Sequence, residues 1–460
     1  MFPLLLFLAF VALATSNELS APPALSKPFR HLLSRQTNNT VWPHGPFRTS
    51  GRDIVNALGD KVTWAGLVWP LHEETMLPEG LEYTSVDNLL ARVSSLGFSQ
   101  ITLSLPVQLI DSLYPTTNTT NSTQQPTLST SLVTTLGTEN GTKLTNKIIA
   151  YNPIWTASTP NLKILTDITR IAAHHSILVH PVPYVGKAGW CCTHTDGSAW
   201  FADTSFSASN WTRALSYLAE WSKNHTNVVS IGLKHAPRES YALRSGYNWL
   251  NYVGNMSLAY DTVRRANPDL LVVWSGLSAG EDLSALTAGR NLNTADCYGC
   301  ERVRDGLRRE EVVFGAGNGT KLVWELSVET ESETLDTGSC RVLEAQLYRN
   351  GLNALGIARP AGCNVTADCP AAKELRPVVL EGFGGKGVDR TKECVRQLTT
   401  RYGVSWTGWG LAGSFRVKEG VQGWEDERGL TSGNWTAWRE PAQVEGFWKP
   451  WVAEMGISRP

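Results

Sequence analysis

The segment Gly276-Leu-Ser-Ala-Gly280 has residue types and spacing that could do chemistry. It follows an apolar run that ends in Trp274, and it matches the nucleophile elbow of α/β-hydrolases, in which a serine is the attacking group. That fold requires a histidine downstream of the serine, whereas the last of the nine histidines is His235. We therefore predict a turn after a strand at this segment, and no serine hydrolase.

Metal and phosphate sites have even less support in the sequence. The glycine-rich segment 382–387 lacks the strand, loop and helix spacing of a phosphate-binding loop. His174 and His175 are adjacent in a helical pattern, so their side chains point to different faces. The other central histidines, His180, His194 and His235, match no known ligand spacing. The sequence therefore predicts no metal ion and no cofactor.

The first residues and the cysteines indicate export. Residues 2–14 form an apolar run that is too short to span a bilayer and is followed by small residues suited to cleavage, so we predict a signal peptide over residues 1–16. No later apolar stretch approaches the about 20 residues that a helix needs to span a membrane. Ten Asn-x-Ser/Thr sequons support a secreted, extracellular glycoprotein; they begin at Asn38, Asn118, Asn121, Asn140, Asn210, Asn224, Asn255, Asn318, Asn364 and Asn434.

The eight cysteines form an even set that is compatible with four disulfides in an oxidising compartment. Their spacing does not determine which cysteines pair. Cys297-Tyr-Gly-Cys300 has the spacing of a redox or zinc pair, but export favours a structural disulfide.

Composition excludes several classes of protein. The 41 Lys and Arg residues nearly balance the 42 Asp and Glu residues, and no basic run is present, so nucleic acid is not expected as a partner. An apolar content of 42% is ample for a core. Trp, at 18 residues, outnumbers both Tyr and Phe, at 12 each. Such rings either pack in a core or stack on the faces of sugars, and composition leaves both uses open.

Secondary-structure elements must position any catalytic residues. The alternation of apolar runs with helical patterns predicts a parallel α/β fold. Apolar runs of strand length occur at 62–67, 100–103, 177–179, 228–233, 270–274, 322–326, 378–380 and 406–409. Helical patterns lie between them at 85–96, 161–173, 208–223, 256–266, 342–352 and 390–401. Eight strands alternating with helices indicate a single (β/α)8 barrel with long loops, whose site lies at the carboxyl ends of the strands. We expect one barrel domain over residues 51–456 in a monomer, an irregular N-terminal arm over 17–50 and a flexible Ser/Thr-rich glycosylated insertion at 115–146.

Six segments in order resemble glycoside hydrolase family 5, the cellulase type. The resemblance covers residues 52–450 and is closest to the plant and fungal branch with a Gly-Trp-Cys-Cys segment after the third strand. The segments are Trp64-Ala-Gly-Leu-Val-Trp-Pro70, Pro78-Glu-Gly-Leu81, Ser95-Leu-Gly-Phe-Ser-Gln-Ile-Thr-Leu103, Gly189-Trp-Cys-Cys192, Val228-Val-Ser-Ile-Gly-Leu-Lys-His-Ala-Pro-Arg238 and Trp409-Gly-Leu-Ala-Gly-Ser-Phe415.

The resemblance implies a retaining hydrolase of β-glycans with a Glu acid/base ending strand four and a Glu nucleophile ending strand seven. Here the expected acid/base position is Ala236, and its expected Asn neighbour is His235. The expected nucleophile position is Gly382. The Arg expected on strand two is Thr102, and the expected Asp-Asn-His segment aligns with Val182-Pro-Tyr184. These replacements favour a barrel that has lost its catalytic pair.

Three displaced carboxylates could still rebuild the pair. Glu381 precedes the nucleophile position by one residue, so strand alternation predicts that it points away from the barrel lumen unless a bulge intervenes. Glu239 lies three residues beyond Ala236 on a loop, and Glu325 lies on strand six. An active retaining hydrolase that uses Glu381, Glu325 or Glu239 therefore remains the alternative, and an extracellular scaffold is a third.

The retained frame also predicts a glycan partner, either a polysaccharide or an oligosaccharide. Rings and polar groups near strand ends or loops could contact a sugar even in a barrel without turnover. The candidate binding residues are Trp69, Tyr184, Trp190, His235, Trp324 and Trp409.

Overall fold

A computed structural model describes residues 44–114, 125–243, 246–288, 319–329, 335–336, 338–363, 369–384 and 387–456. All of these lie within one unit, residues 36–460. The predicted signal peptide, the Cys297 and Cys300 pair, and the sequons at Asn38, Asn118, Asn121, Asn318 and Asn364 lie outside the described residues.

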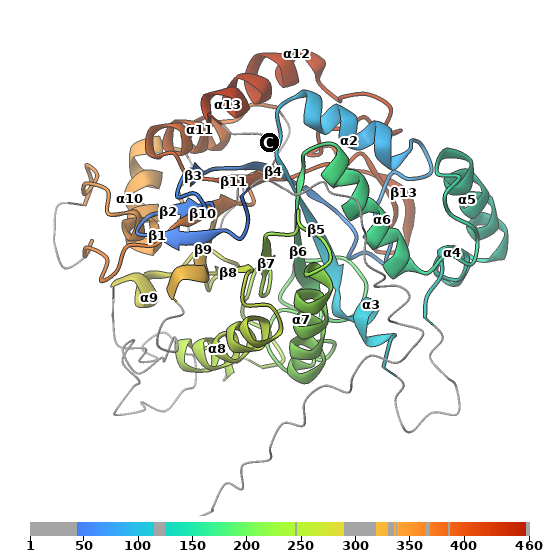
Figure 1. The fold of residues 1–460 in the computed structure, drawn as a ribbon, viewed down its shortest axis with the longest axis horizontal. Helices are drawn as coiled ribbons and strands as arrows, with labels where there is room; N and C mark the ends of the chain where they lie inside the picture. Colours follow the sequence, from blue (N-terminus) through green and yellow to red (C-terminus); the bar gives the residue numbers. More distant parts are fainter. Residues whose placement is uncertain are drawn as a thin grey trace, which may run out of the picture. The chain divides into compact units, whose positions relative to one another are not determined.

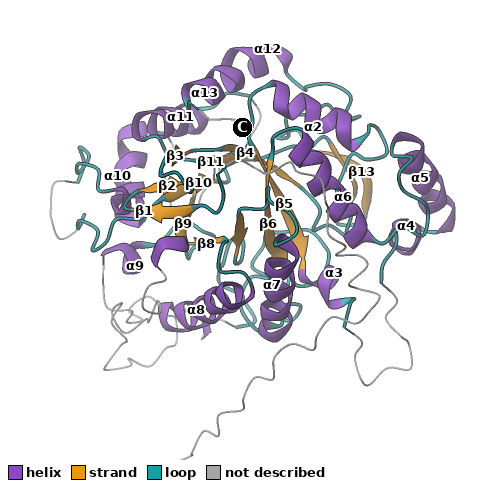
Figure 2. Ribbon diagram, viewed as in Figure 1, coloured by secondary structure: helices purple, strands orange, loops and turns teal. Residues whose placement is uncertain are grey.

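Eight parallel strands form the barrel, which confirms the predicted fold class (Figures 1 and 2). They are β4 (Ala65–Trp69), β5 (Gln100–Pro106), β6 (Leu178–Val185), β7 (Ser230–Gly232), β8 (Leu271–Ser275), β9 (Leu322–Ser327), β10 (Val378–Glu381) and β11 (Trp406–Gly408). The sheet runs in the order β6-β5-β4-β11-β10-β9-β8-β7. Two backbone hydrogen bonds bring its ends together, from Val179 N to Asn227 O (2.9 Å) and from His235 N to Pro183 O (3.0 Å).

Amphipathic helices cover the outside of the strands, because their apolar sides pack against the outward faces of the sheet. Ser85, Ser207 and Asp389 cap three of them by accepting a backbone N–H three residues on. Among the described residues no helix has both the length and the apolar character needed to cross a bilayer. The helices are α2 (Val86–Ser95), α3 (Val107–Asp111), α6 (Asn161–His174), α7 (Ala208–Ser222), α8 (Trp249–Ala266), α9 (Ser284–Ala288), α10 (Cys340–Asn350), α11 (Arg390–Tyr402), α12 (Pro441–Gln443) and α13 (Lys449–Glu454), with short turns η3 (Gly319–Lys321), η4 (Leu352–Leu355) and η5 (Val444–Trp448).

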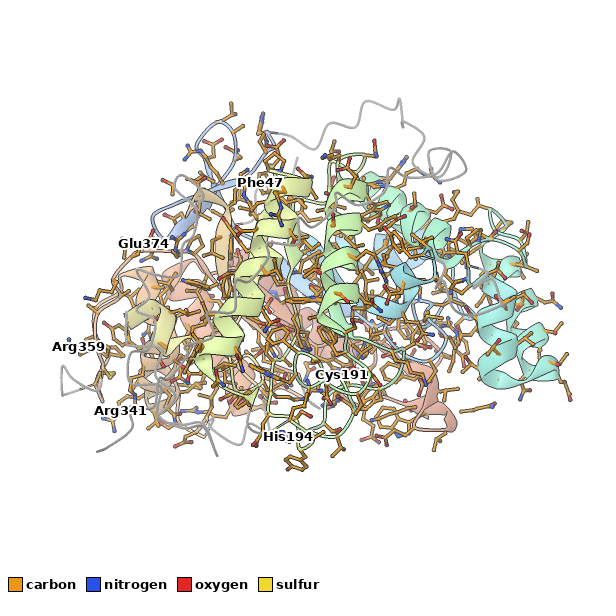
Figure 3. The ribbon with its side chains drawn as sticks, turned by 90° about the horizontal axis from the view of Figure 1, so that it is seen from below. Phe47, Cys191, His194, Arg341, Arg359 and Glu374 are labelled. Atoms are coloured by element: carbon orange, nitrogen blue, oxygen red, sulfur yellow. A yellow bond between two sulfur atoms is a disulfide. The ribbon has the colours of Figure 1, made fainter. Side chains whose placement is uncertain are left out.

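A small antiparallel sheet closes the amino end of the barrel. Its strands are β1 (Arg48–Ser50), β2 (Asp53–Val55) and β3 (Lys61–Val62), so the predicted irregular arm over 17–50 is wrong for its last residues. Ile54 from this sheet and Phe47, which directly precedes it, pack in one buried cluster with lumen residues such as Val323 and Val379. Figure 3 shows Phe47 at one end of the barrel and Cys191 at the other.

The predicted flexible insertion at 115–146 is wrong for its second half, which folds into two helices outside the ring (Figure 1). They are α4 (Leu128–Leu136) and α5 (Thr138–Tyr151). Thr127 and Thr130 form a reciprocal capping box at the start of α4. Leu128, Leu132 and Leu136 recur at every fourth position and are buried, so the polar composition conceals an apolar helical stripe.

A hairpin at the carboxyl end of the barrel follows the last strand. It consists of β12 (Ser414–Lys418) and β13 (Val421–Glu425), joined by Glu419 and Gly420, which both have positive φ values (50° and 81°). Arg416 anchors this hairpin, because its buried guanidinium donates to Glu82 Oε2 (2.7 Å) and to the carbonyls of Leu77 and Pro78. The hairpin is thus tied to the loop that follows β4.

Disulfides are present, as the even cysteine count predicts. The described residues contain the pairs Cys340–Cys394, Cys363–Cys369 and the adjacent pair Cys191–Cys192. Cys340 begins α10 and Cys394 lies within α11, so this bond links two neighbouring helices of the ring. The segment Gly276–Gly280 forms the predicted turn after β8.

Candidate active site

Glu381 lies in the barrel lumen, so the prediction that it points away from the lumen is wrong. In the ladder between β10 and β9, Val379 pairs with Glu325 and Glu381 pairs with Ser327. Side chains two apart on a strand share a face, and Val379 belongs to the cluster that fills the amino end of the lumen. Glu381 and Glu325 therefore both face inward, without any bulge.

Three groups surround the Glu381 carboxylate. His235 Nδ1 lies 3.1 Å from Glu381 Oε1, and the Tyr184 hydroxyl donates to the same oxygen at 3.4 Å. The Glu325 carboxyl makes a side-chain hydrogen bond with Glu381. Glu325, Glu381 and Tyr184 are all buried. The carboxyl end of the lumen therefore holds two carboxyl groups in direct contact.

Burial and charge place one proton between these two carboxyl groups. Burial and the nearby charge of Glu381 raise the pKa of Glu325 well above its usual value, so Glu325 keeps its proton and donates. Burial alone would also raise the pKa of Glu381, but the charge of His235 and the hydrogen bonds from His235 and Glu325 lower it to about 2. Glu381 is thus the ionised member of the pair.

The two protonation states predict how stability depends on pH. Because the pKa of Glu325 is raised on folding, its contribution to stability is complete below about pH 4.5 and falls as the pH rises toward the folded pKa. Glu325→Gln keeps a donor toward Glu381 and removes this titration. We therefore expect the melting temperature of E325Q to fall less than that of the wild type between pH 5 and pH 8, as measured by thermal unfolding. The exposed Glu445→Gln should follow the wild type, and an E325Q profile parallel to the wild type would contradict the assignment.

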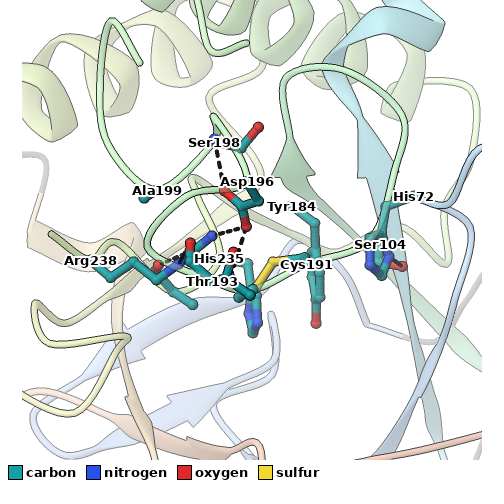
Figure 4. The surroundings of a disulfide bond; sticks show 12 residues. His72, Ser104, Tyr184, Cys191, Thr193, Asp196, Ser198, Ala199, His235 and Arg238 are labelled. Carbon is teal, nitrogen blue, oxygen red and sulfur yellow. Dashed lines mark hydrogen bonds and ion pairs between the residues drawn. A yellow bond between two sulfur atoms is a disulfide. The ribbon is translucent and has the colours of Figure 1, made fainter. Parts of the chain in front are cut away.

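A stack of rings lies beside the carboxyl pair, and Figure 4 shows its members His72, Tyr184 and His235. The Tyr184 ring stacks on His235 with centroids 3.8 Å apart, and on its other side His72 lies 4.9 Å away. His72 is held by Ser104, whose hydroxyl lies 2.7 Å from Nδ1. Burial, with a smaller contribution from His235, lowers the pKa of His72 to about 3, so this imidazole is neutral. Sequence reasoning missed His72, which stands alone without a motif.

No carboxylate stands at the expected acid/base position. Ala236 is buried with φ of 43°, and its carbonyl accepts from Arg238 (2.9 Å). Glu239 is half-buried on the following loop, and its carbonyl contacts His194 Nδ1 at 2.7 Å. After burial and Asp282, the charge of Glu239 makes a smaller contribution to the raised pKa of Tyr247.

The expected nucleophile position, Gly382, has a backbone conformation that disfavours a side chain. Its φ is +94°, in the left-handed region that favours glycine. A Cβ built on Gly382 would lie 2.5 Å from Glu329 Oε1. The Glu329 carboxylate thus occupies the space beside Gly382, and the nearest lumen carboxylate on this strand is that of Glu381.

The predicted aromatic residues fall into two groups. Trp69 and Trp324 are fully buried and do not fit the prediction that they bind a sugar. Trp69 Nε1 donates to the Glu79 carbonyl (3.0 Å), and the Trp324 ring packs against Trp274 on the outer side of the strands. Trp190 and Trp409 are half-buried near the lumen, where Trp409 packs against the cluster that contains Tyr184.

Comparisons with known proteins agree with this architecture. No protein-family model matches the chain. Over 251 residues, or 52% of its length, the chain is 30% identical to a glycosyl hydrolase 5 family protein from Chamaecyparis obtusa. The chain covers 40% of the length of that relative.

Solved structures share the fold at low sequence identity. A hyperthermophilic endocellulase from the archaeon Pyrococcus horikoshii matches with a TM-score of 0.58 and 16% identity, over 89% of this chain and 98% of its own. A variant of an endocellulase from the same organism has been solved as a complex with cellotetraose. The catalytic domain of the major endoglucanase from Xanthomonas campestris matches with a TM-score of 0.56 and 13% identity, over 89% and 99% of the two chains. The curated relative confirms the resemblance to glycoside hydrolase family 5 that the sequence predicts. The solved structures confirm the fold, a single (β/α)8 barrel.

Proposed function

We propose that this protein is a secreted barrel that binds β-glycan and does not hydrolyse it by double displacement. The observation that carries the proposal is the direct hydrogen bond between Glu325 and Glu381, combined with Ala236 at the expected acid/base position. A retaining pair needs its carboxyl groups about 5–5.5 Å apart, so that the glycosidic bond fits between them. Two carboxyl groups in contact leave no room for that bond.

Glu381 is also a poor nucleophile in this setting. Its pKa of about 2 makes it a weak base, and its Oε1 already faces the Tyr184 hydroxyl and His235 Nδ1. Attack on a sugar carbon would require these hydrogen bonds to break. The lumen chemistry therefore supports a carboxylate that organises buried side chains, in place of one that forms a covalent intermediate.

Glycan binding is supported by the half-buried rings of Trp190 and Trp409 near the lumen and by the cellotetraose complex of an endocellulase that shares the fold. Secretion is supported by the disulfides and by the described sequons. Asn140 and Asn434 are exposed, and Asn210, Asn224 and Asn255 are half-buried, so none of these five side chains is enclosed in the core.

One observation favours a second candidate, an active retaining hydrolase. Glu381 is ionised and faces the lumen at the carboxyl end of the seventh barrel strand, which is the strand that carries the nucleophile in the family that the chain resembles. This candidate lacks an acid partner at position 236, but an activated aryl glycoside needs no proton on its leaving group.

An aryl glycoside therefore separates the two candidates. We expect wild-type protein to release dinitrophenolate from 2,4-dinitrophenyl β-cellobioside no faster than the glycoside hydrolyses in buffer alone. Added azide, an external nucleophile, should not change this result. Binding is measured in parallel by calorimetry on β-1,3-, β-1,4- and β-1,6-glucan and mannan oligosaccharides. A burst of one equivalent of dinitrophenolate in the wild type and in the exposed control E445Q, but absent from E381Q, would overturn the proposal and establish the second candidate. Failure to bind any of these glycans would contradict the binding function.

A further inference from the structure

A lysine lies between two tryptophan rings at the rim of the barrel. Lys418 Nζ is 4.0 Å from the centroid of the Trp190 ring and 3.5 Å from that of Trp424. Trp190 comes from the loop after β6, whereas Lys418 and Trp424 come from the β12–β13 hairpin. Phe415 supports both rings, with centroids 5.2 Å from Trp190 and 5.9 Å from Trp424. The three residues that meet here are therefore brought together by the barrel itself.

Within the described part of the chain, the Lys418 ammonium contacts rings and no hydrogen-bond acceptor. A lysine has three N–H donors, and a ring face attracts its charge without satisfying those donors in the way that an oxygen does. Lys418 is half-buried, so its donors still reach solvent. Its charge is therefore held in place and remains available to an anion.

A second cation lies nearby over a third tryptophan. The Arg428 guanidinium carbon is 5.8 Å from the centroid of the Trp409 ring, and about half of its side chain is exposed (47%). Its Nε is 3.6 Å from Asp426 Oδ1, but buried Asp426 also accepts from Trp409 Nε1 at 2.7 Å. Burial and then the charge of Arg428 lower the pKa of Lys418, while the carboxylates of Asp426 and Glu419 act in the opposite direction, so the two cations are close enough to repel each other.

These cations are continuous with the lumen rings. Trp190 lies 6.3 Å from His72, and His72 lies 4.9 Å from Tyr184, which contacts Glu381. Trp409 packs against the same cluster as Tyr184. A sugar chain that leaves the carboxyl end of the lumen on this side would therefore cross the surface that bears Lys418 and Arg428.

We propose that this rim binds an acidic sugar, a uronic acid residue of a β-glycan, with its carboxylate at Lys418 and Arg428 and its ring against the adjacent indoles. The proposal rests on the proposed glycan-binding function and gives it a substrate class. A neutral sugar would remove water from the two cations without bringing an opposite charge. A carboxylate satisfies the open donors of Lys418 and relieves the repulsion between the cations, while the pyranose covers apolar ring surface.

A matched pair of ligands tests the acidic subsite. Cello-oligosaccharides and the same oligomers oxidised at C6 to glucuronic acid share length and linkage, and differ in the carboxylate. On the full chain, calorimetry in 50 mM salt should show about tenfold tighter binding of the oxidised oligomer. The preference should shrink in 300 mM salt, because salt screens exposed charges.

Variants assign the preference to the rim. Lys418→Gln should abolish it, and Lys418→Arg should retain it. Lys449→Gln, which removes an exposed lysine paired with Glu445, should leave it unchanged. Thermal unfolding of each variant verifies that the hairpin is intact. Equal binding of the two oligomers, or a preference that survives in K418Q, would overturn the acidic subsite and leave the proposed function standing. Absence of binding to either oligomer and to the neutral glycan panel would overturn the proposed function itself.

Discussion

Replacing Glu381 with alanine is expected to lower the free energy of unfolding by about 3–5 kcal/mol. The variant loses the acceptor for the Tyr184 hydroxyl, the partner of His235 Nδ1 and the partner of the Glu325 carboxyl. All of these polar groups are largely buried and cannot turn to bulk water without disturbing the lumen. Urea unfolding followed by tryptophan fluorescence measures the loss.

Glu381→Gln is the matched control for that prediction. The amide keeps the volume and one acceptor oxygen, and its N–H groups can donate to Glu325. We therefore expect less than half the destabilisation of E381A. Equal losses in the two variants would mean that the carboxylate charge matters, and that the side-chain volume and the hydrogen bonds that an amide can keep do not.

Arg416→Ala should have an effect of similar size, about 3–5 kcal/mol, because it leaves the buried Glu79 and Glu82 without a cation. Even with Arg416 present, burial raises the pKa of Glu79 to about 8. Without Arg416 the carboxyl must bind a proton or remain buried with its charge. A raised folded pKa favours the folded state at low pH, so the loss should be smaller at pH 5 than at pH 8.

Two other variants set the scale for Arg416. Arg416→Lys keeps the charge but loses the paired N–H donors toward Glu82 and the neighbouring carbonyls, so an intermediate loss is expected. Lys449→Ala removes an exposed ion pair with Glu445 and should cost at most about 0.5 kcal/mol. An R416A variant as stable as K449A would show that the hairpin does not depend on this buried cluster.

Sequence pattern was sufficient for the barrel, because short apolar runs alternate with amphipathic helices along most of the chain. The eight predicted runs all fall on barrel strands, although the observed bounds differ for several of them. The last strand begins at Trp406 as predicted, whereas β6 extends six residues beyond its predicted end, to Val185. Residues 128–151 were missed for a compositional reason. Threonine is the most frequent residue in this stretch, and the polar composition concealed its leucine spacing.

The orientation of Glu381 could not be derived from the pattern alone. Both faces of β10 are buried, so the sequence shows no alternation that marks one face as the lumen. Alignment with the family placed Gly382 inward, and only the pairing with β9 shows that Val379 and Glu381 share the inner face. The same ambiguity explains Trp324, whose ring could not be assigned to the outer side of its strand before the ladder was known.

The meeting of Lys418 with Trp190 was equally inaccessible to sequence reasoning. The two residues are far apart in the chain, and neither lies in a motif that names the other. Their contact follows from the pairing of β4, the first barrel strand, with β11, the last, so that the final hairpin lies beside the loop after β6.

The backbone at Gly382 also constrains what evolution or engineering could do with this lumen. A glutamate placed there would have to adopt a left-handed φ of +94° and would push its Cβ toward the Glu329 carboxylate. Such a variant would be strained, and its new charge would adjoin an existing one. A carboxylate at this position therefore carries the cost of a left-handed backbone and requires the end of the Glu329 side chain to move away.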